Sequence, residues 1–560
     1  MEERLRAAAL YRERGSCSLA APTGKDMSAT RPNVVIVVTD DMGYSDLGCY
    51  GGEIATPTLD RLGRAGVRLS RFYNTTRCSP SRASMLTGLH PHQTGIGILT
   101  SDDRPHGYRG SLNDRCLTLA EILQTAGYTT CLSGKWHLTS DVWNPSDAWP
   151  TRRGFERFFG TLSGCGSYYR PTTLMRGEQN IENEAAAPGF FYTDAITGEA
   201  ETFVKEQATR GANRPLFLYT AYTAPHWPLH APAEDVARYR GKFDAGWDEL
   251  REARLMRLIA EGILAAGTTL SSRDPTQPSW RKAPDKPWQL VRMQTYAAQI
   301  DRLDRGVARL VAALTETGAL ANTLFFFLSD NGASAEGLPI ADPETFRHRR
   351  EIVPPAAWSG APLRIGNSPD IEPGPDDTYC SYGRAWANLS NTPFRFYKRW
   401  VHEGGISTPL IVHWPDGGIR PSILHAPFQL TDIVPTVLEA TGAAYPASYP
   451  GRDPLPLEGR SMLPALRGGT VEPRTLYWEH LGNAAIRRDR WKLVREHPQP
   501  WELYDVDVDR AELHDQAASR LDVVAELGEA WAAWANRVGV IPWERVVDLY
   551  RRGGKGDPTG

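Results

Sequence analysis

Four apolar runs, with helical segments among them, constrain the fold of this chain most. They cover residues 33–38, 128–133, 215–222 and 324–328. Apolar runs of this length are typical of strands that are buried on both faces of a parallel sheet. A capping box from Thr118 to Glu121 begins one helix, and apolar residues at helical spacing from Ile300 to Leu314 mark another. The alternation predicts an α/β fold with a large, mostly parallel central sheet flanked by helices.

The sequence changes character near residue 472. Short strand-like segments at tight spacing and a later helix predict a small C-terminal α+β domain over 473–560, with a four-stranded antiparallel sheet; the segments are 476–479, 484–487, 491–494, 502–504 and 522–538. We expect a main domain over 29–472 and a disordered tail over 1–28.

Two long segments, 267–288 and 335–391, are irregular, and loops of this length tend to be lids or binding walls. Aromatic residues in the longer segment could stack on a ligand or simply pack within the loop; they are Trp358, Tyr379, Tyr382 and Trp386.

Each predicted strand of the large sheet ends in polar residues. They are Asp40 and Asp41, Lys135 and His137, His226, and Asp330 and Asn331. One acidic pair after a strand is usually turn chemistry or a helix cap. Acids, bases and amides at four strand ends are harder to explain in that way. Because ligands of open α/β sheets bind beyond the carboxyl ends of the strands, we expect these side chains to form one site.

Four of these side chains offer only hard oxygen ligands, namely Asp40, Asp41, Asp330 and Asn331. This donor set suits Ca²⁺ or Mg²⁺ and disfavours zinc. A divalent cation held there would neutralise anionic oxygens and act as a Lewis acid.

The run Cys78-Ser-Pro-Ser-Arg82, followed by Leu-Thr-Gly88, is the most specific motif. It can be interpreted as a helix start with Ser79 as N-cap, Pro80 as first residue and Gly88 as terminator. A helix N-terminus also favours an anion, so a structural role and a functional role are compatible. The motif resembles the signature of type I sulfatases, arylsulfatase-like enzymes of the alkaline phosphatase superfamily. In that family the cysteine is oxidised to Cα-formylglycine.

The resemblance extends over about residues 31 to 540. Further matching segments are T-D-D at 39–41, G-K-W-H-L at 134–138, A-P-H at 224–226, S-D-N-G at 329–332, N-T-P-F-R-F-Y-K at 391–398 and H-E-G-G at 402–405. The resemblance implies an alkaline phosphatase-like fold and one bound divalent cation, Ca²⁺ before Mg²⁺. Its implied ligands are Asp40, Asp41, Asp330, Asn331 and the modified Cys78.

The resemblance also implies catalytic roles. Cys78, as formylglycine, would be the nucleophile, Arg82 and Lys135 would hold and activate its diol, and His137 would be the base that releases sulfate. His226 and Lys398 would bind the sulfate group. We favour His226 as the proton donor to the leaving oxygen, because an unperturbed lysine is a poor acid at neutral pH.

The chemistry explains these residue types. A sulfate monoester is an anion, so cations must offset the charge on the transferring group. A gem-diol can expel sulfate by C–O cleavage once its second hydroxyl loses a proton, which requires a general base. Histidine suits acid and base roles near neutral pH. The implied reaction is hydrolysis of an aryl or alkyl sulfate to an alcohol and inorganic sulfate.

Three alternatives stay open at this point. Phosphonate monoester hydrolases and phosphodiesterases share the fold and can share the C-x-P-S-R motif. Dinuclear phosphatases are disfavoured, because no second set of Asp and His ligands surrounds residues 329–331. A non-catalytic binding protein on this scaffold would be expected to have lost a catalytic position, and none is lost.

Composition limits the partners and the compartment. A net charge of −3 over 560 residues argues against nucleic acid, and the absence of an 18-residue apolar span predicts no membrane helix. The N-terminus lacks a secretory apolar region, and the seven cysteines lack disulfide-like spacing, so we expect a cytoplasmic protein. The implied partners are a small-molecule sulfate ester and, during maturation, a formylglycine-generating enzyme. The oligomeric state is left open.

Overall fold

A computed structural model describes residues 31–209, 214–339 and 342–552. Its largest element is an eleven-stranded sheet. The strands are β1 (Asn33–Thr39), β2 (Val67–Tyr73), β3 (Thr129–Gly134), β4 (Arg157–Thr161), β5 (Leu174–Arg176), β6 (Gln179–Asn180), β7 (Leu216–Ala221), β8 (Thr323–Ser329), β11 (Ser407–His413), β12 (Ser422–Leu424) and β13 (Phe428–Gln429). Their order is β12-β2-β11-β8-β1-β7-β3-β4-β5-β6, and β13 pairs with β2.

The centre of the sheet consists of the four strands predicted from the apolar runs. β8, β1, β7 and β3 are consecutive neighbours and are all parallel. In β1, Val34 pairs with Leu324 of β8 and with Phe217 of β7. β11 on one side is antiparallel to β8, whereas β4 on the other side is parallel to β3. The predicted α/β fold with a mostly parallel sheet is therefore confirmed.

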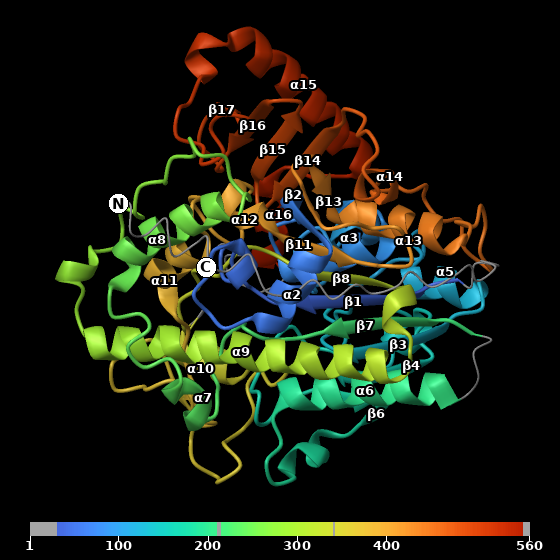
Figure 1. Ribbon diagram of the computed structural model, residues 1–560, viewed down its shortest axis with the longest axis vertical. Coiled ribbons are helices and arrows are strands. Elements are labelled where there is room, and N and C mark those ends of the chain that lie inside the picture. The colour runs from blue at the N-terminus through green and yellow to red at the C-terminus, as the bar shows by residue number, and fades with distance from the viewer. Residues whose placement is uncertain (1–30, 210–213, 340–341, 553–560) are drawn as a thin grey trace, which may run out of the picture. The chain divides into compact units, whose positions relative to one another are not determined.

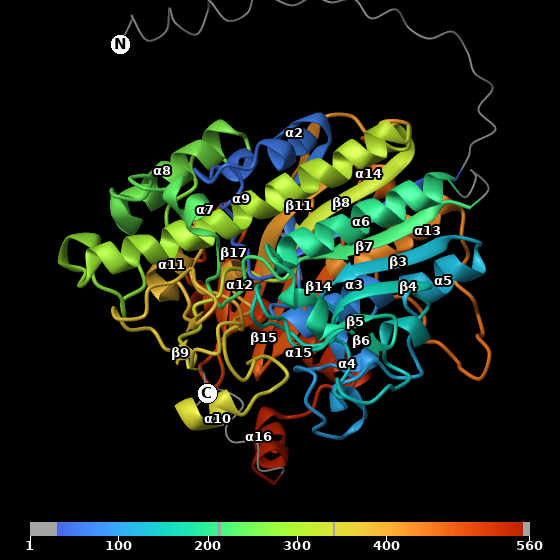
Figure 2. The same cartoon turned by 90° about the horizontal axis from the view of Figure 1, so that it is seen from below.

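Helices cover both faces of the sheet, because side chains alternate along each buried strand. Val35 and Val37 of β1 pack into the core beneath α2 (Pro57–Ala65), α6 (Tyr192–Thr209), α8 (Gly246–Ala260), α9 (Lys286–Glu316) and α11 (Gly383–Ser390). Ile36 packs toward α3 (Cys78–Thr87), α5 (Leu119–Thr125), α13 (Ile433–Thr441) and α14 (Leu463–Leu466). Figure 1 shows α9 and α6 side by side along one face, and Figure 2 shows the sheet between them and α3 and α5.

Two sequence predictions on helix bounds were wrong. α9 begins at Lys286 with Pro287 in its first turn, so the end of the predicted irregular segment 267–288 is helical. α3 begins at Cys78 with Arg77 as its N-cap, two residues before the predicted cap at Ser79. Proline is tolerated throughout the first helical turn, because the N–H groups there have no intrahelical partner. Pro80 therefore did not fix the start of this helix.

The segment predicted to be irregular over 335–391 contains short elements. They are α10 (Pro343–Arg347), β9 (Arg364–Ile365), β10 (Thr378–Tyr379) and the helix α11. Leu338, Phe346 and Tyr379 form a small apolar core with Trp227, which follows β7. This core fixes the segment beside the carboxyl end of the central strands.

The C-terminal part contains the predicted four-stranded antiparallel sheet, in the order β14-β15-β16-β17. Its elements are β14 (Thr475–His480), β15 (Asn483–Arg488), β16 (Trp491–Arg495) and β17 (Glu502–Asp505), followed by α15 (Leu521–Val538) and α16 (Trp543–Arg552). The four strands and the helix over 522–538 are confirmed. The domain boundary at 472 stays a prediction, and the tail over 1–28 lies outside the described residues.

Apolar side chains of α16 join residues from a distant part of the chain. Trp543, Val546 and Tyr550 share a small core with Ile98 and Tyr108.

The remaining α-helices of the described residues are short, namely α4 (Pro91–Thr94), α7 (Ala233–Ala237) and α12 (Glu403–Ile406). In the part of the chain that the structure describes, no helix is long and apolar enough to span a membrane.

A buried charged cluster joins α12 to the C-terminal sheet, and we name it the Glu403 cluster. The Lys492 Nζ lies 3.0 Å from Glu403 Oε1 and 2.7 Å from Glu512 Oε1. The Arg510 Nη2 donates to Glu403 Oε2 at 3.0 Å. Burial alone would raise the pKa of Glu403, but Lys492, Arg510 and Arg487 outweigh it and lower the pKa to about 2.

Candidate active site

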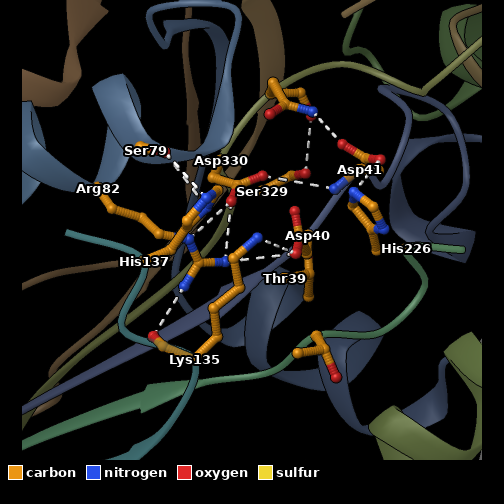
Figure 3. Close-up of polar contacts among 12 residues, drawn as sticks. Thr39, Asp40, Asp41, Ser79, Arg82, Lys135, His137, His226, Ser329 and Asp330 are labelled. Carbon is orange, nitrogen blue, oxygen red and sulfur yellow. Dashed lines mark hydrogen bonds and ion pairs between the residues drawn. The ribbon is translucent and has the colours of Figure 1, made fainter. Parts of the chain in front are cut away.

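The carboxyl ends of the four central strands bring the sequence-predicted polar residues together (Figure 3). Asp40 and Asp41 follow β1, and Asp330 and Asn331 follow β8. Thr39 pairs with Ser329 in register, so the two acidic segments leave adjacent strands at the same level. The Asn331 Nδ2 donates to Asp41 Oδ1 at 2.6 Å.

Two cations lie among these carboxylates, fully buried. The Lys135 Nζ, just after β3, donates to Asp40 Oδ2 at 2.5 Å. The Arg82 guanidinium reaches in from α3, and its Nε donates to Asp330 Oδ2 at 2.9 Å. We name Asp40, Asp41, Arg82, Lys135 and Asp330 the strand-end cluster. Sequence reasoning placed all five at one site, and their side chains do lie together.

The two aspartates of this cluster that contact Arg82 or Lys135 have opposite pKa shifts. Burial and then repulsion from Asp40 raise the pKa of Asp330 to about 7. Burial also acts to raise the pKa of Asp40, but Lys135, His226 and Arg82 outweigh it and hold that pKa at about 2. The positive charges of Arg82 and Lys135 thus do not fully offset the negative charges of the carboxylates, because one carboxylate, that of Asp330, keeps a proton up to neutral pH.

The cluster also fits a divalent cation. Two buried oxygens, Asp40 Oδ1 and Asn331 Oδ1, have no hydrogen-bond partner within the described parts of the chain. Asp40, Asp41 and His226 each place one possible ligand atom within 4.8 Å of the others. Unpartnered acceptors and an uncompensated carboxylate are what a site for a hard cation requires.

Cys78 is the first residue of α3 and is 3% exposed. Burial raises the pKa of its thiol, and the positive charges of Lys135 and Lys398 oppose that shift. Cys78 lines a cavity of about 490 Å³ together with His137, His226 and Lys398. The predicted nucleophile therefore lies at a helix N-terminus, facing a space large enough for a small ester.

His137 is held in a tight position. Its backbone has a φ of 56°, and Ser79 Oγ lies 3.2 Å from its Nδ1. Gly164 packs against the ring so closely that a Cβ there would lie 2.4 Å from His137 Cε1, so a glycine is required. Burial and then Lys135 and Arg82 lower the pKa of His137 well below its usual value. The imidazole is therefore neutral near pH 7 and able to accept a proton.

His226 and Lys398 form a pair at the cavity wall. The Lys398 Nζ lies 3.2 Å from His226 Nε2 and 3.1 Å from Asp41 Oδ2. The other ring nitrogen of His226, Nδ1, lies 2.7 Å from the carbonyl of Trp227 and is placed to donate to it. A backbone hydrogen bond from Lys398 N to Ala333 O brings this lysine back to the end of β8 after the long segment. This bond explains how Lys398, distant in sequence, reaches the site.

Glu336 also lies at the site, and sequence reasoning missed it. Its Oε2 accepts from Trp227 Nε1 at 2.8 Å and from Lys398 Nζ at 3.3 Å, and its Oε1 lies 3.2 Å from Arg77 Nη2. It lines the same cavity as Cys78. The available signal was weak, namely an acid six residues after Asp330 at the start of an irregular segment.

Only one of the two segments predicted to form the walls of the cavity does so. Of the two irregular segments, 335–391 contributes Glu336, Arg349, Glu351 and Ile352, whereas none of the described lining residues comes from 267–288. The other walls are formed by residues within 99–102, 139–143 and 163–165. The four aromatic residues considered for stacking do not line the cavity; Tyr379, Tyr382 and Trp386 are buried, and Trp358 is partly exposed elsewhere. Trp143 and Trp227 line it instead.

The six described cysteines form no disulfide with one another, and five of them are buried. Their placement explains the lack of disulfide-like spacing. Cys165 lines the cavity wall, whereas Cys49, Cys116 and Cys131 belong to the cores on the two faces of the sheet.

Comparison with known proteins gives the same assignment. Residues 32–443 match the sulfatase family, and residues 394–530 match the C-terminal region of N-sulphoglucosamine sulphohydrolase. An uncharacterized sulfatase of Schizosaccharomyces pombe is 32% identical over 92% of this chain and 96% of its own length. An arylsulfatase of Klebsiella aerogenes is 31% identical over 77% of this chain and 91% of its own.

A solved structure shows the same fold. Ps i-CgsB, in complex with k-i-k-neocarrahexaose, superposes with a TM-score of 0.65 at 23% sequence identity, over 94% of this chain and 98% of that one. Because the sulfatase match covers residues 32–443, well over half of the chain, this protein belongs to the sulfatase family, whose members are sulfuric ester hydrolases of the alkaline phosphatase superfamily.

Proposed function

We propose that this sulfatase hydrolyses aryl or alkyl sulfate monoesters at the cavity that Cys78 lines, with Cys78 as the nucleophile in its formylglycine form. One observation carries the proposal. The helix N-terminus that holds Cys78 opens on a cavity whose inner wall carries cations and two imidazoles. Such a surface stabilises an anion that gains charge in the transition state.

Formylglycine and the divalent cation would contribute to the reaction in different ways. Formylglycine at position 78 would supply a hydrated aldehyde as the nucleophile. A divalent cation held by Asp40, Asp41, Asp330 and Asn331 would neutralise the ester oxygens; Ca²⁺ is our first choice, and Mg²⁺ is the alternative. The unpartnered oxygens of Asp40 and Asn331 support this ligand set.

The side chains of the chain itself then have defined roles. Lys135 and Arg82 hold positive charge beside the nucleophile. His137, which is neutral, accepts a proton at a ring nitrogen.

Lys398 and His226 bind the ester oxygens, and we keep His226 as the proton donor to the leaving oxygen. Burial acts to lower the pKa of Lys398, but Asp41 and Glu336 outweigh it and raise that pKa above its usual value. The lysine, 3.2 Å from His226 Nε2, is therefore the poorer acid of the two.

The burial of Cys78 bears on when this residue could be modified. A thiol that is 3% exposed at the start of a helix is not accessible to a second enzyme in the folded protein. We therefore propose that a formylglycine-generating enzyme acts on Cys78 before the chain folds. We also propose a cytoplasmic location, which the absence of a disulfide among the described cysteines supports.

Mass spectrometry of the Cys78 peptide, combined with an assay of matched esters, tests the function. Conversion to formylglycine makes the peptide about 18 Da lighter than the thiol form. Converted protein should hydrolyse 4-nitrophenyl sulfate, lose activity when its metal is chelated, and recover with Ca²⁺ or Mg²⁺. Converted, metal-loaded protein that hydrolyses a phosphonate monoester but no sulfate ester would overturn the proposal in favour of a phosphonate monoester hydrolase.

A further inference from the structure

A carboxylate lies at the anion-binding cavity, where its negative charge repels the expected anionic ligand. Glu336 contacts the cavity through its carboxylate, and its side chain is 13% exposed. Its Oε2 is 3.3 Å from Lys398 Nζ, which in turn is 3.2 Å from His226 Nε2. An ester group held by Lys398 and His226 therefore lies one contact away from a negative charge. Anion-binding sites normally exclude such a group.

Glu336 is ionised despite its burial. Burial acts to raise its pKa, but Lys398, Arg77 and His226 outweigh it and hold the pKa well below its usual value. The hydrogen bond from Trp227 Nε1 acts in the same direction. The carboxylate is thus a fixed charge, held by contacts with three segments of the chain.

We propose that Glu336 makes this cavity selective for esters that carry one negative charge over esters that carry two. The inference rests on the proposed function and deepens it. Coulomb repulsion scales with the charge of the ester, so a fixed carboxylate disfavours a dianion twice as strongly as a monoanion. A sulfate monoester carries one charge. A phosphate monoester carries nearly two above its second pKa of about 6.

A purely supporting role for Glu336 makes a different prediction. Glu336 also orients Lys398 and Trp227 through its hydrogen bonds. If that were its whole role, its replacement would impair every ester with the same leaving group to the same extent. The ratio of activities on two esters therefore separates selection by charge from support of Lys398.

Glu336→Gln removes the charge and keeps the size. We measure kcat/KM at pH 8 on three esters of 4-nitrophenol, namely the sulfate, the phosphate and the phenylphosphonate. The phosphate-to-sulfate ratio should rise about tenfold, because one unit of repulsion between partly buried charges is removed. The phosphonate-to-sulfate ratio should stay within twofold, about the precision of such ratios, because both esters carry one negative charge and lose the same repulsion when the carboxylate is removed.

Two matched variants complete the test. Glu336→Asp keeps the charge and should retain the wild-type phosphate-to-sulfate ratio. Glu351→Gln removes another acid of the same cavity, one that is 31% exposed and paired with Arg349 at 2.8 Å, and should leave the ratio unchanged. An unchanged ratio in Glu336→Gln, or an equal rise in Glu351→Gln, would overturn the inference.

The test remains decisive if Glu336→Gln yields little folded protein. Competitive inhibition of the wild type by phenyl phosphate and by phenyl methylphosphonate at pH 8 then reports the same preference. The monoanionic phosphonate should bind at least several-fold more tightly, and tighter binding of the dianion contradicts the inference. Wild type that hydrolyses no sulfate ester would instead be a failure of the proposed function.

Discussion

The strand-end cluster and the Glu403 cluster have similar composition but differ in their surroundings. Each contains carboxylates, a lysine and arginine among side chains that are almost fully buried. In the Glu403 cluster, cations outweigh burial and hold the pKa of Glu403 at about 2. In the strand-end cluster, the pKa of Asp330 is raised to about 7. Asp40 Oδ1, and the Oδ1 of the neighbouring Asn331, have no hydrogen-bond partner among the described residues.

We interpret this difference as the distinction between an ionic cluster that stabilises the fold and one that is suited to bind a ligand. Burial of charge occurs in both and identifies neither. The informative features are incomplete compensation of charge and access to a cavity, because both cost free energy unless a ligand uses them. Lys398, which contacts Asp41, lines the cavity together with Cys78, which connects the strand-end cluster to the ligand space.

The largest expected effect is on activity. Asp330→Asn should lower kcat/KM on 4-nitrophenyl sulfate by on the order of a thousandfold, because it removes the charge of a side chain that we propose as a ligand of the cation. The free energy of unfolding of the metal-free protein should not fall and should tend to rise, because folding raises the pKa of Asp330 to about 7 and asparagine removes the cost of burying that charge. Activity assays and urea unfolding measure the two quantities.

Asp432→Asn is the matched control for that variant. Asp432 is also fully buried and lies 2.6 Å from an arginine, Arg474, but it does not line the cavity. The variant should lose stability, because both carboxylate oxygens of Asp432 accept from backbone N–H groups, those of Gln429 and Arg460 at 2.8 Å, and asparagine keeps only one of the two acceptors. Its kcat/KM per folded molecule should be unchanged. If Asp330→Asn were the more destabilising of the two, the distinction between the two kinds of cluster would fail.

The next effect is on stability. Lys492→Met should lower the free energy of unfolding by about 3–5 kcal/mol, because Glu403 and Glu512 lose a buried cation. Its kcat/KM per folded molecule should match the wild type. Urea unfolding with activity measured on the folded fraction checks both. A loss of activity without a loss of stability would place Lys492 in the catalytic machinery.

The smallest effect is a dependence on pH. Folding lowers the pKa of Glu403 from its ordinary value of 4.5 to about 2, so the contribution of its charge to the free energy of unfolding is complete above pH 4.5 and is lost as the pH falls toward 2. In full, the charge of Glu403 contributes about 3 kcal/mol to the free energy of unfolding. The stability difference between wild type and Glu403→Gln should therefore shrink between pH 6 and pH 3. Glu526→Gln, at an exposed pair with Arg488, should parallel the wild type throughout.

Sequence reasoning was accurate where structure is local. The β1 and β8 strands were predicted to within a residue or two, because continuous β-branched and aromatic runs have few alternatives to a buried strand. The strand-end cluster followed from the same strands, since its members lie directly after them or in the adjoining Cys78 motif. Parallel pairing then places their ends at one edge.

The parts that were missed depend on tertiary contacts. Glu336 and the residues of 139–143 reach the cavity through loop paths that no periodicity encodes. Tyr379 and Trp386 are aromatic residues of the kind that often line binding sites, but both pack in apolar cores of the protein. The start of α3 at Cys78 was missed because a proline within the first turn does not specify which of its positions it occupies.

The contact of α16 with Ile98 and Tyr108 has a consequence for biosynthesis. Residues 99–102, next to Ile98, line the cavity. The helix that packs against Ile98 is the last one of the described chain, more than four hundred residues after Cys78. This part of the cavity wall can therefore reach its folded position only after the ribosome has synthesised α16. If a formylglycine-generating enzyme acts before folding, as we propose, this late contact lengthens the time during which the thiol at position 78 is accessible.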